Sequence, residues 1–272
     1  MEDTIGKEKV VHGREWGTQH GGYFADPGIA RPMVDAVRAV LSQSPADIVV
    51  DLGGGTGFLL SELASNGVGV GASLVNVDCS NAQLSQVNRQ GITPVATSIN
   101  AFRRGDAGAE DRRFFFMMRS VIHYVGEAGV LPLLRRLRGA ARDGEFFVHQ
   151  TASFDNAQDA ACLNALYGHM NTRKWYPTAD ALRGLLADAG WRVTAVVPAP
   201  PLLLKSEELA RRYDLDPAAI ARIRDVMAAT FGEIHGVFRL KPSGFDANLH
   251  YKIYTCVAGY AEPFDIPPCP MV

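Results

Sequence analysis

Short apolar runs alternate with segments of helical periodicity along most of this chain. Apolar residues recur on one helical face over about residues 28–43, at positions 29, 33, 34, 37, 40 and 41. The next run, 46–52, is apolar almost throughout, as in a strand that is buried on both faces. A helical segment over 57–67 follows and ends at Gly67. The chain therefore begins its regular structure as helix, buried strand and helix.

The same alternation continues to about residue 198. It predicts further strands at 72–78, 92–98, 113–121, 144–151 and 191–198, and further helices at 80–91, 127–142 and 178–190. Strands that alternate with helices favour a doubly wound α/β sheet whose strands are mostly parallel. A seventh strand is expected within 247–261, antiparallel to the sixth strand and at the edge of the sheet.

The stretch between the sixth and seventh strands is too long for a hairpin turn and carries its own helical patterns. One of them starts with Asp216 as a cap, has Pro217 in its first turn and ends at Gly232. We therefore expect three parts. They are an N-terminal cap segment over 1–27, a sheet domain over 28–200 and 247–262, and a helical insertion over 201–246 that forms a lid over the substrate site.

Composition narrows the class of protein. The chain has 272 residues, of which 47% are hydrophobic, and its formal net charge is −2, so it can bury a core and lacks the basic field of most nucleic-acid binders. It has no apolar run near the ~20 residues that span a bilayer, and its first residues do not resemble a signal peptide. The four cysteines match no metal or redox spacing. We expect a cytoplasmic protein with no bound metal.

The most informative motif is Val49–Phe58, VVDLGGGTGF, between the first strand and the next helix. A phosphate-binding P-loop would require a lysine after the glycines, and this chain has none there. A dinucleotide fingerprint would place a third small residue at Phe58. The pattern that the chain does satisfy is D-x-G-x-G-x-G. Its members are Asp51, Gly53, Gly55 and Gly57.

With this motif the chain resembles the class I S-adenosylmethionine-dependent methyltransferases of the small-molecule type, over about 28–200 and 247–260. The resemblance implies a Rossmann-like fold and S-adenosyl-L-methionine as the cofactor. It also implies that Asp78, at the end of the second strand, binds the two ribose hydroxyls. Asn100 stands where the family more often has an aspartate beside adenine. The cofactor-binding residues expected in this way are Asp51, Gly53, Gly55, Gly57, Asp78, Cys79, Asn100, Ala101, Arg119, Ser120 and Tyr23.

Three residues are candidates for the catalytic site. His123 and Tyr124 follow the fourth strand, and Tyr176 precedes a later helix. Histidine is the side chain that most readily acts as a base near neutral pH. A tyrosine ring can stabilise a nearby sulfonium by cation–π attraction.

The expected activity is methyl transfer to a small-molecule acceptor. One alternative is intramolecular attack on another carbon of the sulfonium, which resembles azetidine-forming enzymes and releases methylthioadenosine. Another is a non-catalytic cofactor-binding module. Methylation of DNA is disfavoured, because residues 119–122 read RSVI where that group has an Asn/Asp-Pro-Pro-aromatic tetrapeptide. We expect neither a nucleic acid nor a membrane as partner, and a homodimer stays open.

Overall fold

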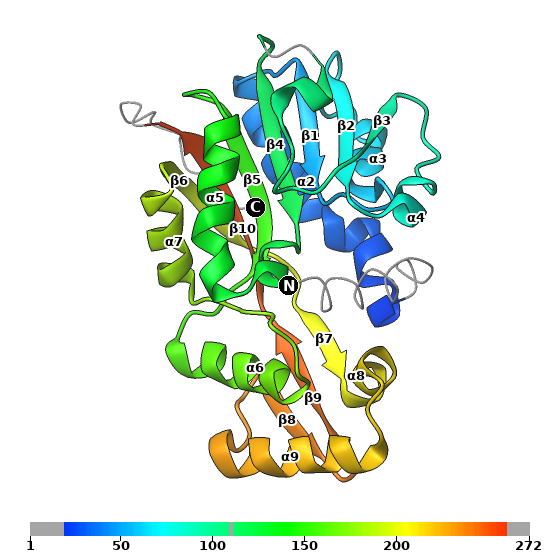
Figure 1. The fold of residues 1–272 in the computed structure, drawn as a ribbon, viewed down its shortest axis with the longest axis vertical. Coiled ribbons are helices and arrows are strands. Elements are labelled where there is room, and N and C mark those ends of the chain that lie inside the picture. The colour runs from blue at the N-terminus through cyan, green and yellow to red at the C-terminus, as the bar shows by residue number, and fades with distance from the viewer. Residues whose placement is uncertain (1–18, 109–110, 260–272) are drawn as a thin grey trace.

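A seven-stranded sheet forms the centre of the upper part of the molecule (Figure 1). The computed structural model describes residues 19–108 and 111–259. The strands of this sheet are β1 Ile48–Leu52, β2 Ser73–Asp78, β3 Ile92–Ala96, β4 Phe114–Arg119, β5 Phe146–Ala152, β6 Trp191–Pro198 and β10 Tyr251–Ala258. Their order is β3-β2-β1-β4-β5-β10-β6, and only β10 runs antiparallel to its neighbours. The doubly wound, mostly parallel sheet is therefore confirmed.

The position of β10 corrects one expectation. The last strand does pair antiparallel with β6, but it also pairs with β5, from Tyr251 opposite Ala152 to Val257 opposite Phe146. It is thus inserted between the two, and β6 forms the edge of the sheet. The burial of β10 fits this place, since six of its last seven residues are buried apolar or small side chains on a strand with two neighbours.

Helices cover both faces of the sheet, as its side chains require. On β1, Ile48, Val50 and Leu52 belong to one core cluster and Val49 to another, because successive side chains point to opposite faces. The first cluster is closed by α5 Glu127–Ala140 and α7 Ala179–Asp188. The second is closed by α2 Pro27–Gln43 and α3 Phe58–Ser65. Every strand of the sheet's centre is therefore buried on both faces.

Two helix predictions were wrong. The helix expected over 80–91 exists only as α4 Asn81–Leu84, which Ser80 caps by accepting from the Gln83 amide. A helix that the pattern did not predict, α6 Ala157–His169, follows β5. Its buried side chains contact the inserted part of the chain, so its apolar face is explained by residues far away in the sequence.

The insertion is only partly helical. It contains α8 Ser206–Tyr213 and α9 Pro217–Phe231, together with a three-stranded antiparallel sheet of β7 Leu202–Lys205, β8 Phe238–Lys241 and β9 Gly244–Leu249. The apolar run expected as one strand over 247–261 is divided at His250 between β9 and β10, which belong to different sheets. Residues of α6 and of the insertion share one core cluster and form the lower part in Figure 1.

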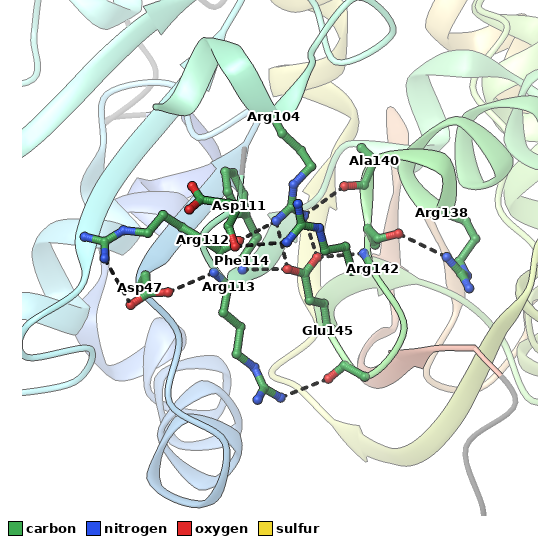
Figure 2. A network of polar contacts seen from close by, with 12 residues as sticks. Asp47, Arg104, Asp111, Arg112, Arg113, Phe114, Arg138, Ala140, Arg142 and Glu145 are labelled. Carbon is green, nitrogen blue, oxygen red and sulfur yellow. Dashed lines mark hydrogen bonds and ion pairs between the residues drawn. The ribbon is translucent and has the colours of Figure 1, made fainter. Parts of the chain in front are cut away.

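At the edge where β4 and β5 begin, polar groups form a dense network around the buried Glu145 (Figure 2). Its carboxylate accepts hydrogen bonds from Arg104 at 2.7 and 3.0 Å. It also accepts from the backbone amides of Phe114 and Arg142, each at 2.8 Å. Arg104, from the short helix η2 Arg104–Ala107, lies over the Phe114 ring with its guanidinium carbon 4.0 Å from the ring centre. This network connects η2 and the turn after α5 to the amino-terminal ends of β4 and β5.

Candidate functional site

The glycine-rich turn leaves the carboxyl end of β1 in a conformation that favours glycine. Gly53, Gly55 and Gly57 have φ values of 76°, 55° and 75°. A Cβ at Gly53 would lie 2.8 Å from a methyl of Val121, and one at Gly55 would lie 2.5 Å from the Gln83 side-chain oxygen. Side chains at these positions would be strained and would also fill the space above the turn.

Gly54 is a requirement that the motif reading missed. A Cβ there would lie 2.1 Å from Asn76 Oδ1 and 2.5 Å from Asp51 Oδ2, and both of these side chains are buried. Asn76, in the middle of β2, donates a hydrogen bond of 2.8 Å from Nδ2 to the Gly55 carbonyl. A polar residue inside an otherwise apolar strand was the available signal. Asn76 thus supports the turn from below.

Two aspartates flank the turn in different settings. Asp78 is half-buried at the end of β2, where Oδ2 accepts from the Gly55 amide at 3.0 Å and Oδ1 accepts from the Ser80 amide at 2.8 Å. Asp51 is 1% exposed, and its Oδ1 has no hydrogen-bond partner among the described residues. Burial raises the pKa of Asp51 to about 7, against the attraction of Arg119 and with a contribution from Asp78.

Arg119 ties the N-terminal segment to the end of β4. Its guanidinium donates to the backbone carbonyl of Phe24 at 3.2 Å and lies 5.8 and 5.5 Å from the ring centres of Tyr23 and Phe24. Tyr23 comes from the short helix η1 Gln19–Ala25. Its hydroxyl donates to the Pro200 carbonyl at 2.5 Å and accepts from Gln150 at 3.3 Å. Tyr23 thereby joins η1, β5 and the start of the insertion.

Ser120 follows β4 in the left-handed region, with φ of 61°. Its hydroxyl lies 2.6 Å from the hydroxyl of Tyr251, and its amide donates to the Gln150 carbonyl at 2.8 Å. Strained backbone of this kind is often found at functional sites. The structure therefore brings three predicted residues, Tyr23, Arg119 and Ser120, into one cluster beside the glycine turn.

The three predicted catalytic residues also lie together. The His123 ring contacts the Tyr124 ring in a tilted arrangement, with ring centres 4.1 Å apart, and stacks on the Tyr176 ring at 5.3 Å. His123 and Tyr124 belong to the short helix η3 Ile122–Val125. Burial raises the pKa of the Tyr176 hydroxyl well above its usual value, so this group stays protonated at neutral pH. Tyr176 can provide an aromatic wall but is unsuited to act as a base.

His149, in the middle of β5, lies inside the sheet. Its ring is stacked between Phe147 and Tyr254 at 4.7 and 5.0 Å, and its Nδ1 is 2.8 Å from the Thr151 hydroxyl. Burial lowers its pKa to about 3, so it is neutral. These contacts make His149 part of the core.

The remaining predicted residues lie on the rim. Cys79 is exposed after β2, and Asn100 and Ala101 are exposed in the turn after β3. The residue of that turn that reaches the glycine loop is Ile99, whose side chain would lie 3.3 Å from a Cβ at Gly53. Over residues 19–108 and 111–259, no group of three His, Cys, Asp or Glu side chains is arranged to hold a metal ion. Within the same residues, no helix is long and apolar enough to cross a membrane.

These features fit the S-adenosyl-L-methionine cofactor that the glycine motif implies. The turn offers backbone approach in a cradle that any Cβ would obstruct, Asp78 offers a carboxylate beside it, and Asp51 Oδ1 is a buried acceptor with no described partner. All lie at the carboxyl ends of β1 and β2, next to the point where the strand order reverses between β1 and β4. Open α/β sheets bind nucleotide-like ligands at that point.

The fold and this turn define an open α/β protein with a cofactor site of the adenosyl type. Residues 28–196 match the family model described as a methyltransferase domain. The chain therefore belongs to this family, the class I methyltransferases that use S-adenosylmethionine. A search of curated proteins found no significant match.

Solved structures share the fold at low sequence identity. The YcgJ protein of Bacillus subtilis is 10% identical, with a TM-score of 0.61 over 86% of this chain and 99% of that one. The N-methyltransferase NodS of Bradyrhizobium japonicum, in complex with S-adenosylhomocysteine, is 12% identical, with a TM-score of 0.55 over 93% and 98%. The 1,6-didemethyltoxoflavin-N1-methyltransferase of Burkholderia thailandensis is 16% identical, with a TM-score of 0.53 over 94% and 90%.

Proposed function

We propose that this protein transfers the methyl group of S-adenosylmethionine to a small-molecule acceptor. The observation that carries the proposal is the glycine turn with Asp78 beside it, at the sheet's switch point and next to the aromatic cluster of His123, Tyr124 and Tyr176. Two of the structurally similar proteins are named as N-methyltransferases and were crystallised with S-adenosylhomocysteine, and one of them also holds 1,6-didemethyltoxoflavin, which supports the same class.

The protein's own residues would divide the work between two groups. Gly53, Gly55 and Gly57 leave room for the cofactor, and the Asp78 carboxylate accepts hydrogen bonds from the ribose hydroxyls. Asp51, Arg119, Ser120 and Tyr23 surround the same end of the sheet and complete the cofactor side. Asn100, Ala101 and Cys79 line its rim.

When bound, S-adenosylmethionine supplies an activated methyl group on a positively charged sulfur. Tyr124 and Tyr176 present aromatic rings that attract a cation, an effect of roughly 0.5–2 kcal/mol for each well-placed ring. The His123 ring packs against both of these tyrosine rings and helps to fix their positions. Orientation and exclusion of water would supply most of the rate, because a cofactor that is already activated needs positioning more than acid–base help.

The test is to incubate the purified protein with S-adenosylmethionine, alone and with a broad panel of amines, phenols and acids, and to identify products by mass spectrometry. The proposal expects S-adenosylhomocysteine only when an acceptor is present. Methylthioadenosine formed without an acceptor would overturn methyl transfer in favour of intramolecular cyclisation. Tight binding with no turnover across the panel would identify a non-catalytic module.

A further inference from the structure

Lys174 is buried in a setting made of tyrosines. The residue is 8% exposed, and its Nζ donates a hydrogen bond of 2.8 Å to the Tyr213 hydroxyl. The same ammonium lies 4.8, 5.4 and 5.5 Å from the ring centres of Tyr124, Tyr167 and Tyr213. Lysine is seldom buried to this extent, so a site that holds its charge among ring faces suggests a specific use of that charge.

A second cation, Arg212 of α8, reaches the same tyrosines. Its Nη2 lies 3.5 Å from the Tyr124 hydroxyl, and its guanidinium carbon is 5.6 Å from the Tyr213 ring centre. Tyr124 and Tyr213 therefore lie in contact with both Lys174 and Arg212. We refer to Lys174, Arg212, Tyr124, Tyr167 and Tyr213 as the cationic tyrosine cluster.

The orientation of Arg212 is set by a chain of polar contacts. Its Nη1 donates to Nε2 of His20 at 2.8 Å, and Nδ1 of His20 lies 3.4 Å from the Glu208 carboxylate. Because a guanidinium only donates, Nε2 must accept and the proton must be on Nδ1, facing Glu208. His20 thus orients Arg212 towards the cluster, and its ring lies between Arg212 and Glu208.

The cluster lies where an acceptor would approach the cofactor. Tyr124 follows β4 directly in η3, and its ring is packed against His123, next to Tyr176. Lys174 is next to Trp175, whose amide donates to the His123 carbonyl at 3.2 Å. Arg212 and Tyr213 come from the insertion. The two parts of the molecule therefore meet at these side chains, on the carboxyl side of the sheet.

We propose that the cationic tyrosine cluster recognises the acceptor and selects planar acids, with the acceptor's carboxylate held by Lys174 and Arg212. This inference rests on the proposed methyltransferase function and adds the chemical class of its substrate. Arg212 supplies a planar fork that matches a carboxylate, and Lys174 supplies a compact charge with several donors. The half-buried rings of Tyr124 and Tyr213 supply flat surfaces for the body of the ligand.

The experiment compares acids with their neutral amides. Benzoate and benzamide, 4-hydroxybenzoate and 4-hydroxybenzamide, and anthranilate and anthranilamide are titrated against the full-length protein saturated with S-adenosylhomocysteine. Binding is followed by ligand-observed NMR. We expect at least one acid to bind at least ~10-fold more tightly than its amide, since removing the charge loses both charge-assisted contacts. In Lys174→Met and Arg212→Gln, the preference should fall towards unity.

Lys205→Met and Arg211→Gln are the matched controls, because Lys205 and Arg211 are exposed on the same part of the chain. They should keep the preference of the unmodified protein. Equal binding of acid and amide in every pair, or a preference that survives in Lys174→Met, would overturn the proposal. Titration with S-adenosylhomocysteine alone should give the same affinity in all four variants, which shows that each still folds.

The outcomes separate this inference from the function on which it rests. Selective binding of acids without S-adenosylhomocysteine formation from any acceptor would refute methyl transfer and leave the cluster's selectivity in place. Turnover of a neutral acceptor that is unchanged in Lys174→Met would support methyl transfer and refute the cluster's role. Turnover of an acid with a KM that rises in both variants, while kcat changes little, would support both.

Discussion

Two buried carboxylates, at opposite ends of the strands of the central sheet, have very different surroundings. Glu145, at the amino-terminal edge, accepts from both ends of the Arg104 guanidinium and from two backbone amides (Figure 2). Asp51, at the carboxyl-terminal edge, has an oxygen with no described partner and a pKa raised to about 7 by burial. The first carboxylate is fully hydrogen-bonded by the protein itself, whereas the second has an oxygen that residues 19–108 and 111–259 leave without a partner.

The difference indicates what each edge is for. A buried charge that is fully hydrogen-bonded holds parts of a structure in register. A buried acceptor without a partner costs free energy and is expected where a ligand supplies what is missing. In the sequence, Asp51 and Glu145 look alike, because each is an acidic residue near the end of a strand. Only their surroundings in the structure distinguish the structural carboxylate from the functional one.

The largest effect on stability should come from disrupting the hydrogen-bond network around Glu145. In Arg104→Met, Glu145 would stay buried without its ion-pair partner, which typically costs about 3–5 kcal/mol. Urea denaturation should show this loss in the free energy of unfolding. Arg135→Met, at an exposed position of α5, is the control and should change stability by no more than about 0.5 kcal/mol. Equal stability of the two variants would show that the network contributes little.

At the carboxyl-terminal ends of the strands, Asp78→Ala should weaken cofactor binding. Hydrogen bonds to a charged group are worth about 1.5–3 kcal/mol, so affinity for S-adenosylhomocysteine should fall by roughly 10- to 100-fold. Isothermal titration calorimetry measures this directly. Asp188→Ala, on the exposed end of α7, should bind as the unmodified protein does. Unchanged affinity in Asp78→Ala would mean that the ribose lies elsewhere.

Gly54→Ala tests the support beneath the turn. Its Cβ would collide with the buried Asn76 and Asp51 side chains, and overpacking of this kind costs about 1–3 kcal/mol. Thermal unfolding should show a lower Tm. The control is Gly139→Ala on α5, where no atom lies within 4 Å of the new Cβ and alanine favours the helix. If both variants were stabilised, the contacts under the turn would be looser than described.

Asp51 should also make the stability of the protein depend on pH. Because its folded pKa is raised from 3.8 to about 7, the folded state binds the extra proton between those values. Stability from this group is therefore present at low pH and lost as the pH rises towards 7. Asparagine at position 51 cannot titrate, so the stability of Asp51→Asn relative to the unmodified protein should rise by roughly 2–3 kcal/mol between about pH 5 and about pH 8. Denaturant titrations at several pH values measure this, and a stability difference between the two proteins that stays constant with pH would contradict it.

The sheet was predictable from local patterns because its central strands are continuous apolar runs and its turns carry glycines. The cofactor motif was predictable for the same reason, since Asp51, Gly53, Gly55 and Gly57 are neighbours in sequence. By contrast, α6 was missed because its buried side chains pack against residues of the insertion, over 30 positions away in many cases.

Contacts over long sequence distances also explain what was missed at the acceptor side. His123, Tyr124 and Tyr176 were predicted singly, and the structure brings them together. Nothing local indicates that Arg212 reaches Tyr124, 88 positions earlier, or that Tyr213 accepts from Lys174. Periodicity identifies the helix that carries Arg212 but does not place that helix beside η3.

The insertion begins and ends at one place in the central sheet. Pro198 at the end of β6 is paired with Lys252 near the start of β10, and the Ala199 amide donates to the Tyr251 carbonyl at 2.9 Å. The chain therefore leaves the central sheet and returns to it at neighbouring positions. A recombination event could replace the residues between these positions by another segment while β6 and β10 stay paired. Evolution can therefore exchange the inserted segment as a cassette, without altering the part of the chain that holds the glycine turn.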